Sequence, residues 1–239
     1  MSIANSYQGV RHVVVDNLGS GSITVEPGSG EDLVEASVDA ADETFLDQIH
    51  IRHDHDWLRI SFPHQSFRFT KTDLRLRVPD GLDYAIKTGS ADVVISADIG
   101  RSKIVSGSGD ISVARVAGNG SRLNSGSGDV SIGEANSSLA AKSGSGDVVV
   151  KSLRGGSLQA NSGSGDIAVS STSGSVDLRS ASGSLTIGVA DNLPTWLDLN
   201  SVSGDIRIGL ELTAQPEPGQ PYITLRARTA SGDISIYRA

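Results

Sequence analysis

Aspartate recurs at nearly even intervals in this chain, and it is the first residue type whose spacing could do chemistry. The pattern SGSGDI or SGSGDV occurs four times, with 18 or 19 residues between successive aspartates. Stacked carboxylates are ligands that Ca²⁺ prefers, but a carboxylate beside a turn can also accept hydrogen bonds from turn N–H groups. This Asp ladder comprises Asp92, Asp110, Asp129, Asp147, Asp166, Asp205 and Asp233, with Ser184 at the equivalent place.

The turns on the opposite side of each repeat separate these two interpretations. A calcium-binding coil of two nine-residue repeats needs a Gly-rich turn on both sides. Here the opposite turns read VARVAGNGS, GEANSSL and KSLRGGS, and they contain no aspartate. We therefore interpret the Asp ladder as a set of structural turn caps. A repeat protein stabilised by calcium or another divalent metal is the alternative.

The histidines form a second candidate site, because all five lie in the first 64 residues. In the sequence HDHD, His53 and His55 could share one strand face and bind a divalent ion together with Asp54 or Asp56. An exposed polar hairpin loop explains the same four letters. We therefore expect no bound metal, with these four residues as the candidate ligands.

Other catalytic patterns are missing from the sequence. No G-x-S-x-G motif occurs that could form a nucleophile elbow, and no Gly-rich turn carries the lysine of a phosphate-binding P-loop. A carbohydrate-active β-helix needs aromatic platforms beside carboxylates, and no aromatic residue lies between Tyr84 and Trp196. We expect no enzymatic activity, no catalytic residue and no cofactor, and a carbohydrate-active β-helix is the third interpretation.

The elements that position the Asp ladder are short strands. A period near 18 residues suits one coil of a narrow β-solenoid. Each period holds two stretches of alternating apolar and polar residues, such as SRLNS and DVSI, which predict two strands with one buried side each. One coil cannot bury its apolar residues alone, whereas a stack of coils can. We predict an all-β, single-domain, parallel β-solenoid with two short strands per coil.

The first third of the chain is less regular. Residues 13–26 read as a degenerate first coil, and several further strands follow. We predict that residues 1–80 form an irregular N-terminal β region that caps the solenoid and is continuous with it. Residues 81–239 form the regular repeats.

The turns and the chain end give two further expectations. We expect glycine in the SGSGD turns because a tight reversal needs positive φ angles, which cost glycine least. The last strand, ISIYR, runs almost to Ala239, so we expect it to form an uncovered edge of the stack.

One column of small residues is a candidate interaction surface. The outward positions of the second strand in each coil hold small or aliphatic side chains, which let another sheet approach closely. We call this column the small-residue strip: Val94, Ser112, Ser131, Val149, Ala168 and Thr186. We predict that this strip, or an open end of the coil, binds a protein partner or a second copy of the chain.

Composition limits the other partners. A formal net charge of −8 argues against nucleic acid. The chain has no cysteine, and no apolar run approaches the roughly 20 residues that span a bilayer. The beginning, MSIANSYQGVRHVVV, lacks the basic and apolar regions of a signal peptide. We therefore expect no transmembrane segment and a cytoplasmic location.

The run PDGLDYAIKTGSADVVI, the serial SGSGDI/V turns and the late SGDIRI and SGDISI resemble a bacterial family of β-strand-repeat proteins. Its members are known as "putative adhesin" proteins, and the family has no established biochemical function. The resemblance covers essentially the whole chain and implies one β-solenoid-like domain without defined catalytic residues. It favours a non-enzymatic, adhesin-like interaction or scaffold module.

Overall fold

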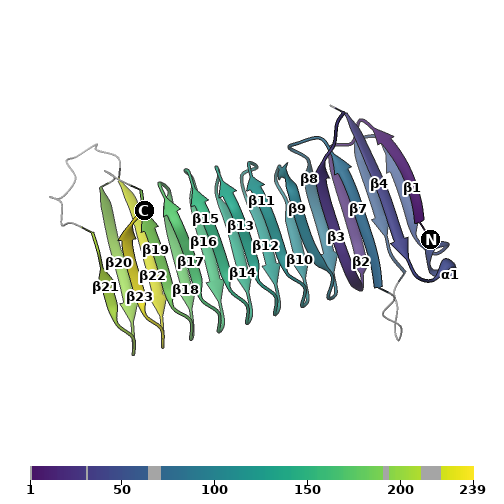
Figure 1. Cartoon of the computed structure of the whole chain (residues 1–239). Coiled ribbons are helices and arrows are strands. Elements are labelled where there is room, and N and C mark those ends of the chain that lie inside the picture. Colours follow the sequence, from purple (N-terminus) through teal and green to yellow (C-terminus); the bar gives the residue numbers. More distant parts are fainter. Residues whose placement is uncertain (1, 31, 64–70, 191–193, 211–221) are drawn as a thin grey trace.

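The chain folds into two long β-sheets that lie face to face across a thin core (Figure 1). The computed structural model describes residues 2–30, 32–63, 71–190, 194–210 and 222–239. These residues form 23 strands and one short helix, α1 (Glu43–Leu46). The fold is therefore all-β, as the sequence predicted.

The larger sheet, sheet A, has twelve strands in the spatial order β1 (Ser2–Gln8), β4 (Leu33–Ala40), β7 (Lys71–Val78), β3 (Ser20–Pro27), β9 (Asp92–Ile99), β11 (Ile111–Val116), β13 (Val130–Ala135), β15 (Val148–Leu153), β17 (Ile167–Thr172), β19 (Leu185–Val189), β23 (Ile234–Arg238) and β21 (Ile206–Ile208). Sheet B has eleven strands in the order β20 (Thr195–Ser201), β22 (Ile223–Thr229), β18 (Ser175–Ser180), β16 (Ser157–Ser162), β14 (Leu139–Ser143), β12 (Ser121–Ser125), β10 (Lys103–Ser106), β8 (Asp83–Thr88), β2 (His12–Leu18), β6 (Trp57–Ser61) and β5 (His50–Asp54).

From β8 onward the chain alternates between the two sheets, so that each coil adds one strand to sheet B and one to sheet A (Figure 1). Like strands pair in parallel and in register, with Ile111 opposite Val130 and Val130 opposite Val148. The inward residues of these strands form one continuous hydrophobic cluster. The predicted parallel β-solenoid is confirmed.

The glycines of the SGSGD turns have a different role from the one we expected. None of them has a positive φ angle; the glycines that do are at other positions. Instead, a Cβ atom on Gly128 would lie 2.5 Å from the carbonyl oxygen of Gly109 in the neighbouring coil. The expectation of left-handed turns was wrong. Glycine is required there because the backbones of adjacent coils approach too closely for any side chain.

A buried hydroxyl closes each of these turns. Ser125 Oγ accepts a hydrogen bond from the Gly128 N–H at 2.9 Å and donates one to the Gly109 carbonyl of the previous coil at 3.0 Å. Equivalent pairs of bonds are made by Ser143, Ser162 and Ser180. The same side chain therefore shapes its own turn and ties that turn to the neighbouring coil.

The last coils do not stack in chain order. Strand β23 pairs with β19 on one side and with β21 on the other, and β22 likewise lies between β18 and β20. The final strand is therefore inside the stack, and the expectation that it forms the uncovered edge was wrong. The edge belongs to β20 and β21, which come earlier in the chain (Figure 1).

The N-terminal third combines parallel and antiparallel pairing. Strands β2 and β3 pair in parallel with β8 and β9 of the first regular coil. In contrast, β1, β4 and β7 pair antiparallel with one another, and so do β5 and β6. Phe45 and Leu46 of α1, together with Ile49, are buried against this end of the core. These three side chains therefore extend the core at the N-terminal end, where β1 and β5 are the edge strands of the two sheets.

Candidate functional site

The Asp ladder runs along the corner between the two sheets. Five of the carboxylates, from Asp92 to Asp166, each accept a hydrogen bond from the backbone N–H of the equivalent residue in the next coil. Asp129 Oδ1, for example, lies 2.8 Å from the Asp147 nitrogen. In the last coils Asp233 Oδ1 accepts from Asp205, as the spatial order of the strands requires. The caps therefore act between coils, whereas we expected them to act within one turn.

One oxygen of each capping carboxylate already accepts a hydrogen bond from a backbone N–H group. That oxygen is therefore less available as a ligand for a cation at the corner. The described residues contain no group of three or more His, Asp or Glu side chains arranged to hold a metal ion. The corner is a hydrogen-bonded seam that links neighbouring coils.

The HDHD segment forms the tip of the β5–β6 hairpin. Asp54 ends β5 and pairs with Trp57, and His55 has a positive φ angle in the turn between the strands. His55 Nδ1 lies 2.6 Å from Asp54 Oδ1, whereas the ring of His53 contacts that of Tyr7 edge-on at 5.5 Å. Asp56 faces His12 at 3.5 Å. The four candidate ligands therefore have different partners and do not converge.

The structure brings together a different group, which the sequence did not reveal. His12 lies between Asp56 and Asp83, at 3.5 Å from each carboxylate. Its ring stacks on that of Trp57, with centroids 4.4 Å apart. His12, Trp57 and Asp83 come from β2, β6 and β8, and Asp56 comes from the turn before β6. The three strands are adjacent only because of their pairing in sheet B. No sequence pattern gives the register of strands so far apart in the chain.

The small-residue strip is one continuous column on the outer face of sheet A. Its six residues are register partners from β9 to β19, and all are exposed or half-buried. A parallel column beside it also contains small residues, interrupted by Lys151. Lys151 is the one charged residue in these two columns, and ion pairs of Arg115 with Asp98 and Glu134 lie near the ends of the same strands.

The end of the stack at β20 and β21 is different from every other coil. Ile206 and Ile208 are 42% and 49% exposed, whereas the register partners Ile234 and Ile236 are buried. Leu197 and Leu199 of β20 are only partly buried, although they pack against the core. These four residues occupy inward positions, and among the described residues no further coil lies over them. We call them the open end.

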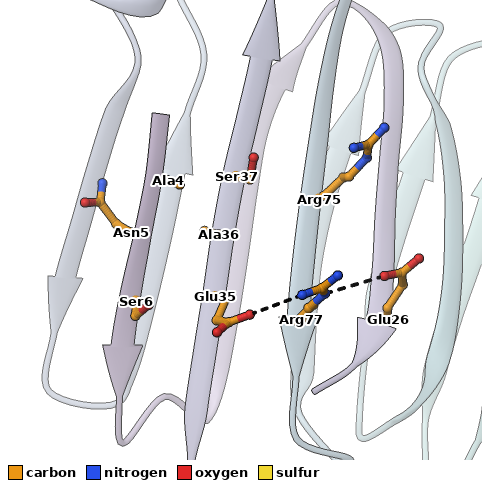
Figure 2. Close-up of a pocket in the computed structure, with 9 residues that line it drawn as sticks. All are labelled: Ala4, Asn5, Ser6, Glu26, Glu35, Ala36, Ser37, Arg75 and Arg77. Carbon is orange, nitrogen blue, oxygen red and sulfur yellow. Dashed lines mark ion pairs between the residues drawn. The ribbon is translucent and has the colours of Figure 1, made fainter. Parts of the chain in front are cut away.

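The outer face of sheet A also carries a depression of about 400 Å³ in the N-terminal third. Figure 2 shows Arg77 between Glu35 and Glu26, with its guanidinium nitrogens 3.8 Å from each carboxylate. The rest of the lining consists of Ala4, Asn5, Ser6, Ala36, Ser37 and Arg75. Because Arg77 is already paired with two carboxylates, it is poorly placed to attract a further anion.

Tyr84 is the one buried side chain among the described residues whose polar atom has no hydrogen-bond partner. Its burial raises the pKa of the phenol well above its ordinary value, and Asp80 adds to the shift. The hydroxyl is therefore neutral across the physiological range.

Comparison with known proteins supports this description at the level of the fold. A putative adhesin from Bacteroides fragilis has a similar structure, with a TM-score of 0.60, 16% identity, and coverage of 99% of this chain and 97% of that one. A putative lipid binding protein from Parabacteroides distasonis has a TM-score of 0.62 at 16% identity, with coverage of 98% and 96%. None of the curated proteins matches the sequence.

Within the described residues, no helix is long and apolar enough to cross a membrane. The sequence itself matches the family described as Toastrack DUF4097 over residues 22–237. Because that match includes both the N-terminal third and all the regular coils, the chain belongs to the Toastrack DUF4097 family.

Proposed function

We propose that this protein is a non-enzymatic, adhesin-like interaction module that associates with a second copy of itself through the open end. The observation that carries the proposal is the exposure of Ile206 and Ile208 at inward positions. The name of the similar Bacteroides fragilis structure is consistent with an adhesin-like role.

A second copy fits the open end better than an unrelated surface does. A coil must be covered by another layer of the same width, with its own apolar residues at the same positions. The edge strands β20 and β21 also present backbone groups that can pair with another strand. The β20–β21 coil of a second molecule meets both requirements.

The other end of the molecule determines what kind of assembly forms. The N-terminal end presents α1 and antiparallel strands, and not a coil of the same pattern as β20 and β21. The matching surface on a second molecule is the same open end. Such a contact is isologous and closes as a dimer instead of growing into a filament.

Sedimentation equilibrium tests this proposal with two matched double variants. We expect a dimer of twice 24.7 kDa for the natural sequence and a monomer for Ile206→Asp/Ile208→Asp. The control, Val94→Asp/Val149→Asp, places the same charges on the small-residue strip and is expected to remain dimeric. Circular dichroism of each variant confirms that the fold is retained.

The results discriminate between the two surfaces. A monomer for the natural sequence up to about 1 mM would refute self-association altogether. A control variant that becomes monomeric, while the open-end variant stays dimeric, would show that the strip forms the interface.

A further inference from the structure

A second depression, of about 310 Å³, lies on the outer face of sheet B where the regular coils meet the N-terminal third. It extends over five neighbouring strands and the turns before some of them, from β6 through β2 and β8 to β10 and β12. Its volume is at the lower limit of ordinary small-molecule sites. The residues that carry the following argument are Trp57, His12, Asp83, Arg101, Lys103 and Arg122.

One end of this depression is aromatic and rigid. Trp57 is 47% exposed, although tryptophan is highly buried on average in folded proteins. Its indole is held by the stacked ring of His12, which is itself held between two carboxylates. The exposed aromatic surface is therefore fixed in place before any ligand arrives.

The other end is cationic, and its charges are not neutralised. Lys103 and Arg122 are register partners on adjacent parallel strands, so their like charges lie side by side. Arg101 lines the same depression from the preceding turn. In the described part of the chain these three make no ion pair, whereas most other arginines lie within 4.0 Å of a carboxylate. Like charges opposite each other on a sheet are destabilising unless an anion compensates them.

Acceptors as well as donors line the site. Asp83 lies between the aromatic and cationic ends, and its carboxylate occupies the space that a side chain on Gly100 would fill. A ligand made only of phosphate groups would be repelled by Asp83. A ligand with hydroxyl groups can donate to that carboxylate while its anionic group binds the arginines.

We propose that this depression binds an anionic saccharide. A sugar ring has an apolar face that can contact the exposed ring of Trp57. It also carries hydroxyls for Asp83 and can carry a carboxylate or sulfate for Lys103 and Arg122. A bidentate carboxylate–arginine pair supplies both affinity and direction. This site is separate from the open end and does not depend on self-association.

Tryptophan fluorescence tests the proposal directly, because the chain contains only Trp57 and Trp196. In a Trp196→Phe background the signal reports Trp57 alone. The probes are trigalacturonate, a sulfated heparin disaccharide, and the carboxyl-reduced neutral form of the first. Inorganic phosphate and pyrophosphate serve as anions that contain no sugar ring.

We expect at least one acidic saccharide to change the Trp57 emission in a saturable manner, and the neutral form to bind at least tenfold more weakly. Arg122→Gln should weaken the binding of that saccharide at least tenfold. The matched control Lys142→Gln, on the same face of sheet B but outside the depression, should change it less than twofold.

Three outcomes would overturn the proposal. The first is that neither acidic saccharide binds with a Kd below about 1 mM. The second is that the neutral saccharide or the two phosphate probes bind as tightly as the acidic saccharide. The third is that Arg122→Gln and Lys142→Gln bind the acidic saccharide with the same affinity. Because Arg122 and Lys142 are both exposed, these substitutions leave the core intact, and unfolding curves confirm this for each variant.

Discussion

The buried hydroxyl of Ser125 offers the sharpest test of how the coils are held together. It is 5% exposed and makes two hydrogen bonds, one with its own turn and one with the neighbouring coil. In Ser125→Ala the Gly128 N–H and the Gly109 carbonyl both lose their partner, and both glycines are buried. A buried polar group left without a partner costs about 1–3 kcal/mol.

Two polar groups without partners therefore cost about 2–6 kcal/mol of folding free energy together. Water that reaches the corner would replace part of the lost hydrogen bonds, and the cost would then lie in the lower half of this range. We therefore expect Ser125→Ala to reduce the free energy of unfolding by about 2–4 kcal/mol. For a chain of this size that corresponds to a fall in Tm of about 4–16 °C. Urea unfolding followed by circular dichroism measures the first quantity, and calorimetry measures the second.

The chain provides its own controls for this experiment. Ser127 lies two residues away in the same turn and is exposed, so Ser127→Ala should change the free energy by no more than about 0.5 kcal/mol. Ser125→Thr should retain most of the stability, because Thr229 makes the equivalent bond to the Gly183 carbonyl at 3.0 Å. Equal stabilities for Ser125→Ala and Ser127→Ala would refute the reasoning.

Three further predictions concern packing, acid and metal. Gly128→Ala should destabilise the fold by about 1–3 kcal/mol, because its Cβ would meet the carbonyl of Gly109; a urea midpoint equal to that of the natural sequence would contradict this. The hydrogen bond from Arg226, with a second from Arg228, lowers the pKa of Asp198 below its ordinary 3.8. The resulting stabilisation is present above pH 3.8 and is lost as pH falls through the lower, folded-state pKa. The difference in urea midpoint between the natural sequence and Asp198→Asn should therefore narrow in acid, and a difference that stays constant with pH would exclude this role. Dialysis against EDTA should leave Tm unchanged, because the Asp ladder binds backbone N–H groups; a fall in Tm that calcium reverses would favour the metal-stabilised alternative.

The regular coils were predictable because one period fixes both the buried column and the register. Ile111 and Val113 alternate with exposed residues, and their equivalents recur every 18 or 19 residues. Any other pairing would expose the apolar columns. The sequence also showed that the SGSGD turns need glycine, but not why. A glycine required by close approach between coils has the same sequence pattern as a glycine required by a left-handed turn.

Two features were beyond sequence reasoning. The coil that contains Asp205 and the coil that contains Asp233 have the same sequence pattern. The sequence therefore does not indicate which of these two coils lies next to the coil of Ser184. In the same way, the contact of His12 with Trp57 and Asp83 depends on the pairing of β2 with both β6 and β8.

The stacking of the coils, including their altered order at the C-terminal end, can be measured by spin-label distances. Cysteine pairs introduced at Val94 and Ser235, or at Val94 and Arg207, place both labels in the same register column of sheet A. Six spacings of about 4.8 Å predict about 29 Å for the first pair, and seven predict about 34 Å for the second. A longer distance to Ser235 than to Arg207 would contradict the observed order, and distances unrelated to the strand spacing would contradict the solenoid itself.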